Sequence, residues 1–147
     1  AATTLRLAQI ENIIGIKEAS SNRGQILEII EGRPEGFLVL SGNDDETFPL
    51  MKAGADGVIS VASNIAPEPV AKLTHAMMEG KVEKAAGLHE MLSPLFRNCF
   101  VESNPIPAKA ALAAMGMMCN ELRLPLVASQ QKTYDLMVET IKDLKLL

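Results

Sequence analysis

Short apolar runs alternate with amphipathic stretches over the first 80 residues of the chain. Three of these runs consist of apolar residues and glycine apart from one polar residue each, which is typical of strands buried on both faces of a parallel sheet. They lie at residues 13–17, 37–41 and 57–61. Each run is followed by apolar residues at helical spacing, so the pattern predicts strand and helix three times in succession. Short loops between such pairs indicate βαβ units on a parallel sheet.

Capping and breaking residues delimit the predicted helices, because polar residues precede them and glycine or proline follows them. Together with an amphipathic turn near the start, these helices cover residues 5–10, 25–31, 43–52 and 67–78. The three polar residues at 20–22 offer an N-cap for the helix at 25–31.

The pattern changes after Gly80, where three more helices are predicted and no further strand. They cover residues 81–98, 104–115 and 130–144. Asn104 is expected to cap the middle one, with Pro105 in its first helical position. The sequence therefore predicts an α/β part at residues 1–80 and an α-helical domain at residues 81–147.

Three parallel strands leave one apolar face without a partner in this chain. Parallel sheets are normally covered on both faces and average about five or six strands. The inward positions are expected to be Ile13, Gly15, Lys17, Leu38, Leu40, Gly57, Ile59 and Val61. A closed barrel of eight strands takes about 250 residues. We therefore expect the trailing part of such a barrel, in a chain that starts at Ala1 without Met and is a processed, truncated or cleaved piece of something longer.

Composition narrows the class of protein. The chain has 147 residues, of which 48% are hydrophobic and 22% charged, with a net charge of −4. An acidic balance and only 3% aromatic residues argue against a nucleic-acid or anionic-membrane partner. No apolar run reaches the roughly 18 residues that cross a bilayer, and no signal peptide is visible. We expect a cytoplasmic protein in which Cys99 and Cys119 are reduced; a disulfide between them is the alternative.

A lysine stands at the carboxyl end of the first apolar run, where parallel α/β folds usually carry their chemistry. If apolar neighbours surround the Lys17 amine, burial lowers its pKa. A neutral amine attacks a keto group and forms a Schiff base. The alternative, which this stretch alone favours, is a strand end whose side chain reaches into solvent.

Two more residues are predicted to share the rim with Lys17. Gly42 and Ile59 lie at the ends of the other two runs, and the carboxyl ends of parallel strands meet at one edge. A glycine lets a ligand approach backbone amides closely, while Ile59 offers a backbone carbonyl or an apolar wall. The alternatives are a plain turn glycine and a core isoleucine.

The remaining polar candidates favour structural roles. The acidic residues at 44–46 look like a metal cluster, but at a helix start they are better explained by attraction to the positive helix end. His75 and His89 lie on predicted helices and are expected to be packed or solvated rather than catalytic. No metal site is expected.

Five segments carry a resemblance to a known family. They are GIKEAS at 15–20, LSGND at 40–44, GADGVISV at 54–61, ESNPIPAK at 102–109 and LRLPL at 122–126. Together they resemble the pyruvate-dependent class I aldolases and, among them, the dihydrodipicolinate synthase family. The Lys-Glu-Ala order that starts at Lys17 favours the synthases over N-acetylneuraminate lyase relatives. The resemblance covers essentially the whole chain.

The resemblance implies a TIM (β/α)8 barrel followed by a helical C-terminal domain, of which this chain holds units six to eight and the helical domain. It implies that Lys17 condenses with pyruvate and that the resulting enamine attacks aspartate semialdehyde, in lysine and diaminopimelate biosynthesis. Gly42 and Ile59 match positions that line the pyruvate pocket, mainly through backbone. No cofactor is implied, since the iminium itself is the electron sink.

The sequence also departs from the family pattern. The first five βα units are absent, and with them the paired threonines, the proton-shuttling tyrosine, the substrate-binding arginine and the allosteric lysine site; Tyr134 lies in the last predicted helix. The proton transfers alone are worth about 10²- to 10⁴-fold, so we expect this half to be inactive or weakly active by itself. One hypothesis is an enzyme portion that pairs with the missing N-terminal half. The other is a non-catalytic binding or regulatory protein that covers its open edges as a homo-oligomer.

Overall fold

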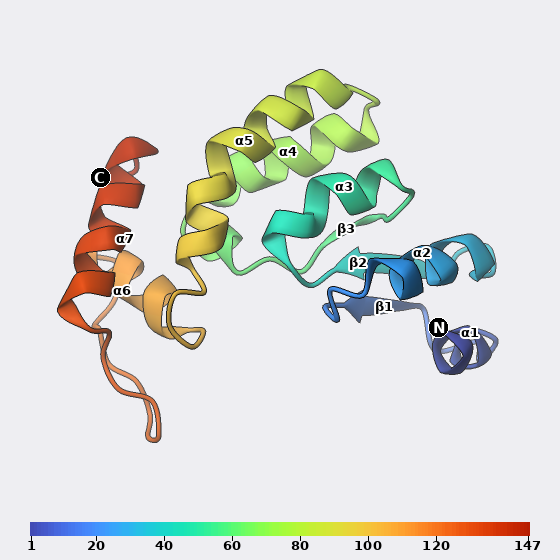
Figure 1. Cartoon of the computed structure of the whole chain (residues 1–147), viewed down its shortest axis with the longest axis horizontal. Coiled ribbons are helices and arrows are strands. Elements are labelled where there is room, and N and C mark those ends of the chain that lie inside the picture. The colour runs from blue at the N-terminus through green and yellow to red at the C-terminus, as the bar shows by residue number, and fades with distance from the viewer. The chain divides into compact units, whose positions relative to one another are not determined.

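The computed structural model describes all 147 residues of the chain. They form two compact units, residues 1–60 with 73–86 and residues 61–72 with 87–147. The sheet and its helices belong to the first unit (Figure 1). Its elements up to the last strand are α1 (Ala2–Leu7), β1 (Gly15–Glu18), α2 (Arg23–Gly32), β2 (Leu38–Ser41), the 3-10 helix η1 (Asp44–Glu46), α3 (Thr47–Lys52) and β3 (Gly57–Val58).

The rest of the chain contains helices joined by loops and no strand, as predicted. Its elements are the 3-10 helix η2 (Ala62–Asn64), α4 (Pro67–Met78), α5 (Val82–Asn98), α6 (Ile106–Ala114) and α7 (Gln131–Asp143). None of these helices combines the length and the apolar character that crossing a membrane requires. The division of the chain into domains at residue 80 stays a prediction.

The three strands form one parallel sheet in the order β1-β2-β3. Lys17 lies opposite Leu40, and Leu40 lies opposite Gly57. Residues paired across a parallel ladder point to the same face, so these three positions share one face of the sheet. The residues that follow them, Glu18, Ser41 and Val58, share the other face. The predicted succession of βα units is therefore confirmed.

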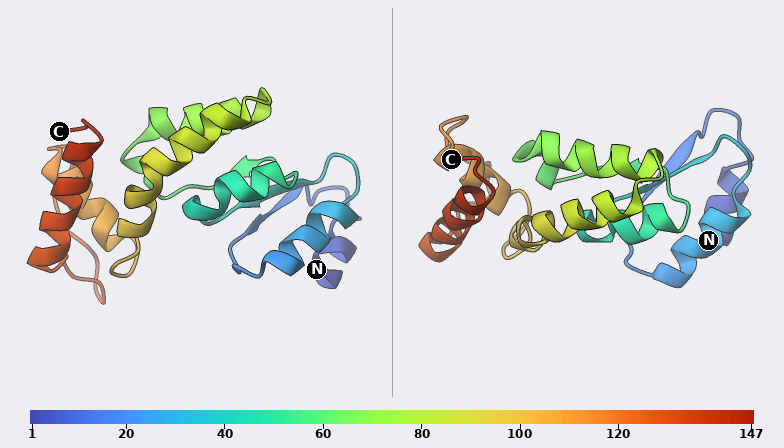
Figure 2. Two further views of the ribbon diagram at one scale, coloured as in Figure 1. Left: turned by 45° about the horizontal axis from the view of Figure 1, so that its top comes forward. Right: turned by 90° about the horizontal axis from the view of Figure 1, so that it is seen from above.

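Helices cover only one face of this sheet. Ile29 of α2 packs with Val39 of β2, which is 1% exposed, and Ile26 of the same helix packs with Leu50 of α3. Figure 2 (right) shows α2 and α3 running along the same side of the strands. Burial of these aliphatic side chains stabilises the unit by about 1.5–3 kcal/mol for each fully buried residue.

The opposite face has no cover within the first unit. Leu38 is 40% exposed and Ile59 is 46% exposed, and Lys17 is exposed as well. The expectation of strands buried on both faces is therefore wrong for this chain, because α2 and α3 lie on one side only. The expectation of an apolar face without a partner is confirmed, except that Ile13 packs into the core on the helix side.

Some helices begin and end where the capping and breaking residues of the sequence predicted. The helix at 67–78 has the predicted bounds, and the Asn22 side chain accepts a hydrogen bond from the backbone N–H of Gln25 at 3.2 Å, which confirms the N-cap. The cap predicted at Asn104 is wrong: Pro105 is the capping residue and α6 starts at Ile106. The turn predicted at 5–10 is the earlier helix α1, and β3 is shorter than predicted.

The second unit has its own core, in which α6 packs against α7. Its fully buried side chains include Leu92, Leu95, Ala110, Ala111, Met137 and Ile141. The Asn98 side chain of α5 donates a hydrogen bond to Thr140 Oγ1 of α7 at 2.8 Å. Cys99 is buried, Cys119 is exposed, and neither forms a disulfide, as expected.

Candidate functional site

Lys17 lies at the carboxyl end of β1 on the uncovered face of the sheet. Its ammonium group makes no hydrogen bond or ion pair with another residue of the chain. A lysine with three donors and no acceptor nearby is available to a ligand or to solvent. The residues around it decide what such a ligand meets.

Gly42 forms the surface on which the Lys17 side chain lies. A Cβ atom added at Gly42 would come within 2.9 Å of Lys17 Cε and within 2.6 Å of Ala19 Cβ. Contacts that short do not occur between real side-chain carbons, so the position requires glycine. The structure thus brings together two predicted site residues that are 25 positions apart in the sequence.

The sheet register explains why these two residues meet. Lys17 lies opposite Leu40 and Glu18 lies opposite Ser41, so Gly42 follows directly at the end of the neighbouring strand. The Gly42 N–H donates to the Glu18 carbonyl at 2.6 Å, which extends the ladder by one residue. This bond holds the turn after β2 against the end of β1.

Ile59 lies one residue beyond β3 and continues that ladder. Its N–H donates to the Ser41 carbonyl at 2.8 Å, and nearly half of its side-chain surface is exposed. Ile59 therefore shares the carboxyl-end rim with Gly42, as the topology predicted. Lys17 is one strand farther away, since β2 lies between β1 and β3.

Glu18 follows Lys17 in the chain but points to the opposite face. It is 7% exposed, and its carboxylate accepts hydrogen bonds from the Ser20 N–H at 2.7 Å and from Gln25 Nε2 at 3.4 Å. These bonds attach the end of β1 to the start of α2. The alternation of the strand therefore presents Lys17 outward while its neighbour is anchored on the helix side.

Hydrogen bonds between the rim loops were not predicted from the sequence. Asp44, which is 2% exposed, accepts a hydrogen bond from the Ser60 hydroxyl, and the Asn43 amide donates to Glu46 and Ser21. Two of the three acidic residues at 44–46 thus tie loops together, which is a different role from the expected attraction to a helix end. No group of three or more His, Cys, Asp or Glu side chains is placed to hold a metal.

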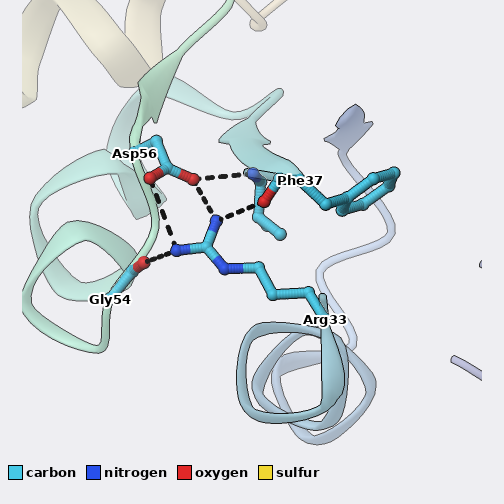
Figure 3. A network of polar contacts seen from close by, with 5 residues as sticks. Arg33, Phe37, Gly54 and Asp56 are labelled. Carbon is cyan, nitrogen blue, oxygen red and sulfur yellow. Dashed lines mark hydrogen bonds and ion pairs between the residues drawn. The ribbon is translucent and has the colours of Figure 1, made fainter. Parts of the chain in front are cut away.

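A second polar network lies at the amino end of the strands (Figure 3). The Arg33 guanidinium forms an ion pair with Asp56 and donates to the carbonyls of Phe37 at 3.0 Å and Gly54 at 2.9 Å. The Val39 N–H donates to the same Asp56 carboxylate at 2.8 Å. Burial raises the pKa of Asp56, but the hydrogen bonds from Arg33 and Val39 and the charge of Arg33 outweigh it, so the pKa lies below its ordinary value.

Comparison with known proteins places this geometry in a family. The dihydrodipicolinate synthetase family model matches residues 1–144. A 4-hydroxy-tetrahydrodipicolinate synthase of Archaeoglobus fulgidus is 46% identical over 142 residues, which are 97% of this chain and 49% of that protein.

Two solved structures are similar over almost the whole chain. Dihydrodipicolinate synthase of Thermotoga maritima superimposes with a TM-score of 0.97 at 45% identity, over 99% of this chain and 51% of that one. The chloride-inhibited dihydrodipicolinate synthase of Acinetobacter baumannii, complexed with pyruvate, gives a TM-score of 0.95 at 34% identity, over 99% of this chain and 50% of that one. The chain spans about half the length of the curated relatives that it matches, and it belongs to the dihydrodipicolinate synthetase family.

Proposed function

We propose that this chain supplies the Schiff-base lysine of a dihydrodipicolinate synthase, with Lys17 as the nucleophile. The whole protein would condense pyruvate with aspartate semialdehyde. The observation that carries the proposal is the placement of Lys17, whose amine is unpaired at the strand-end rim while its carbon chain lies on Gly42. Family membership supports the same assignment.

The proposed reaction starts with attack of the neutral Lys17 amine on the keto carbon of pyruvate. A carbon–nitrogen bond forms and the keto oxygen leaves as water, which yields an iminium. Loss of a proton from the methyl carbon to water then gives an enamine. Its carbon attacks the aldehyde carbon of the semialdehyde, and the aldehyde oxygen takes up the electron pair and a proton. The iminium takes up the electron pair of the broken carbon–hydrogen bond, so the scheme requires no metal or organic cofactor. Hydrolysis of the iminium formed after the attack releases the product and restores the Lys17 amine.

Gly42 and Ile59 are proposed to line the pyruvate site. Gly42 has no side chain, so a small keto acid bound at the Lys17 amine can approach the backbone at this position closely. Ile59 offers an apolar wall on the other side of β2. A small acid such as pyruvate fits a site built from backbone and one aliphatic side chain.

The uncovered face leads to a proposal on assembly. Leu38, Leu40 and Ile59 leave an apolar surface that parallel sheets normally bury. We propose that further strands of a (β/α)8 barrel cover this face, supplied by the remaining portion of the protein or by a homo-oligomer. Location in the cytoplasm stays a prediction.

Trapping with borohydride tests the assignment of Lys17. The chain is incubated with pyruvate and sodium borohydride, and intact-mass analysis and peptide mapping then locate the reduced adduct. We expect one adduct, on Lys17, and none in the K17R variant. K52R, at an exposed residue in the last turn of α3, is the matched control and keeps the adduct. Absence of any adduct on the wild-type chain would contradict the proposal and favour a non-catalytic binding protein.

Complementation tests the activity proposed for the whole protein. The chain is co-expressed with the portion of the Thermotoga maritima relative that it does not match, and condensation of pyruvate with aspartate semialdehyde is measured. We expect turnover to require both partners and to disappear with K17R. Turnover that survives K17R would contradict the role of Lys17.

A further inference from the structure

Three polar side chains form a closed triangle of hydrogen bonds at the rim beside Gly42. Asn43 Nδ2 donates to Glu46 Oε2 at 2.6 Å and to Ser21 Oγ at 3.0 Å, and Ser21 Oγ donates to Glu46 Oε2 at 3.4 Å. We call these residues the rim latch. They connect the loop between β1 and α2 with the turn between β2 and α3, which are more than 20 residues apart in the sequence.

The backbone at Ser21 shows that this loop is held in place rather than relaxed. Ser21 has a φ of 55°, in the left-handed region that residues other than glycine rarely adopt. Such a conformation costs about 1–3 kcal/mol and persists where the surroundings hold it. The bonds to Asn43 and Glu46 supply that support.

The rim latch borders the surface that carries Lys17. Asn43 directly follows Gly42, and Ser21 lies two residues after Ala19. The Ala19 Cβ and Lys17 Cε both lie beside the point that a Gly42 Cβ would occupy, at 2.6 and 2.9 Å from it. The Asn43 backbone is fixed in turn, because its carbonyl accepts from Ser41 Oγ at 2.8 Å and its N–H donates to the same oxygen at 3.2 Å. A shift of either loop would therefore move the floor under the Lys17 side chain.

We propose that Glu46 is a positioning residue that acts through Asn43 and Ser21 to hold the two rim loops together and thereby aligns Lys17 for Schiff-base formation. Glu46 touches neither Lys17 nor the proposed pyruvate site, so it contributes no chemistry of its own. The inference rests on the proposed function of Lys17. It assigns a specific role to a carboxylate whose position the sequence explained by attraction to a helix end.

The test measures how fast the adduct forms. Each variant is mixed with pyruvate and quenched with borohydride at intervals, and the limiting rate is determined separately from the half-saturating pyruvate concentration. E46A is expected to lower the limiting rate by about 10- to 100-fold, since a displacement of about 1 Å costs up to 100-fold. The half-saturating concentration should change far less.

Two further variants separate alignment from stability. E46Q keeps an oxygen that accepts from the Asn43 amide, so we expect rescue to within about threefold of the wild-type rate, the neutral bond being the weaker one. S21G removes the hydroxyl but relieves the left-handed strain, so it should melt no lower than the wild type and still trap more slowly.

The outcomes distinguish this inference from the proposed function. A wild-type chain that forms no adduct on Lys17 overturns both. A wild-type chain that labels normally, with E46A and S21G labelling at the same limiting rate, overturns the role of Glu46 alone. A slow E46A whose rate matches only its loss of folded protein, measured by circular dichroism, also overturns it.

Discussion

The cationic side chains at the two ends of the sheet differ in whether the protein supplies their hydrogen-bond acceptors. At the amino end, the Arg33 guanidinium is bound by the Asp56 carboxylate and by two backbone carbonyls. At the carboxyl end, the Lys17 ammonium has no partner in the chain, and only its carbon stem is packed, on Gly42.

This difference separates a stabilising network from a site. A cation whose donors are mostly bonded to protein acceptors contributes to the fold and has little left for a ligand. A cation without acceptors in the chain adds little to the fold and stays available to a ligand, which is the role that we propose for Lys17. The same division between a stability end and a chemistry end is general among parallel β/α barrels.

The largest effect is expected from removing the unpaired amine. K17A should abolish the borohydride-dependent adduct entirely, because no other group at the rim forms an imine with a keto acid. The free energy of unfolding should change by no more than about 0.5 kcal/mol, as for other exposed positions. Intact mass and chemical denaturation measure the two quantities. A K17A chain that still labels would place the nucleophile elsewhere.

Filling the surface beneath Lys17 should have the next largest effect. In G42A the new methyl group would meet Lys17 Cε at 2.9 Å, Ala19 Cβ at 2.6 Å and the Glu18 carbonyl at 3.2 Å. We expect the trapping rate to fall about 10- to 100-fold and stability to fall by about 1–3 kcal/mol from overpacking. The matched control is G87A, in the interior of α5 with open space around it. It should gain about 0.5–1 kcal/mol and trap at the wild-type rate.

Breaking the amino-end pair should affect stability alone. R33A leaves the half-buried Asp56 carboxylate without its cation, so we expect a loss of about 1–3 kcal/mol in chemical denaturation. The trapping rate per folded molecule should stay at the wild-type value. R23A, at the exposed start of α2, serves as the control and should lie within about 0.5 kcal/mol of wild type. A slow but fully folded R33A would contradict the division between the two ends.

Acid should weaken the same network by a smaller amount. The folded-state pKa of Asp56 lies below its ordinary value of 3.8 because the Arg33 and Val39 bonds outweigh burial. A carboxyl with a lowered folded pKa stabilises the fold above its unfolded pKa, and that stability is lost as the pH falls through the folded value. The stability difference between wild type and D56N should therefore shrink as the pH drops below 3.8. Urea titrations between pH 2 and about 6 measure it, and a difference that stays constant would contradict the assignment.

Local signals in the sequence determined most elements and their order. Pro67 and Gly80 delimit α4, and Asn22 caps α2. Proline has a fixed φ, glycine has an unhindered φ, and asparagine has a short polar side chain, and each of these acts within one turn of backbone. Parallel pairing followed from the succession of βα units, which also placed Lys17, Gly42 and Ile59 at one rim. At the start of α6 the local signal was misleading, because Asn104 and Pro105 predicted a helix start one residue before the observed one.

Contacts between residues distant in the sequence were decided only by the tertiary structure. The pair of Arg33 with Asp56 and the rim latch of Ser21, Asn43 and Glu46 join residues about 20 or more positions apart, and no periodicity or spacing signals them. The sequence likewise predicted strands buried on both faces, because an apolar run shows that burial is required but not what supplies it. Within this chain α2 and α3 cover one face alone, and that leaves Lys17 exposed on the other.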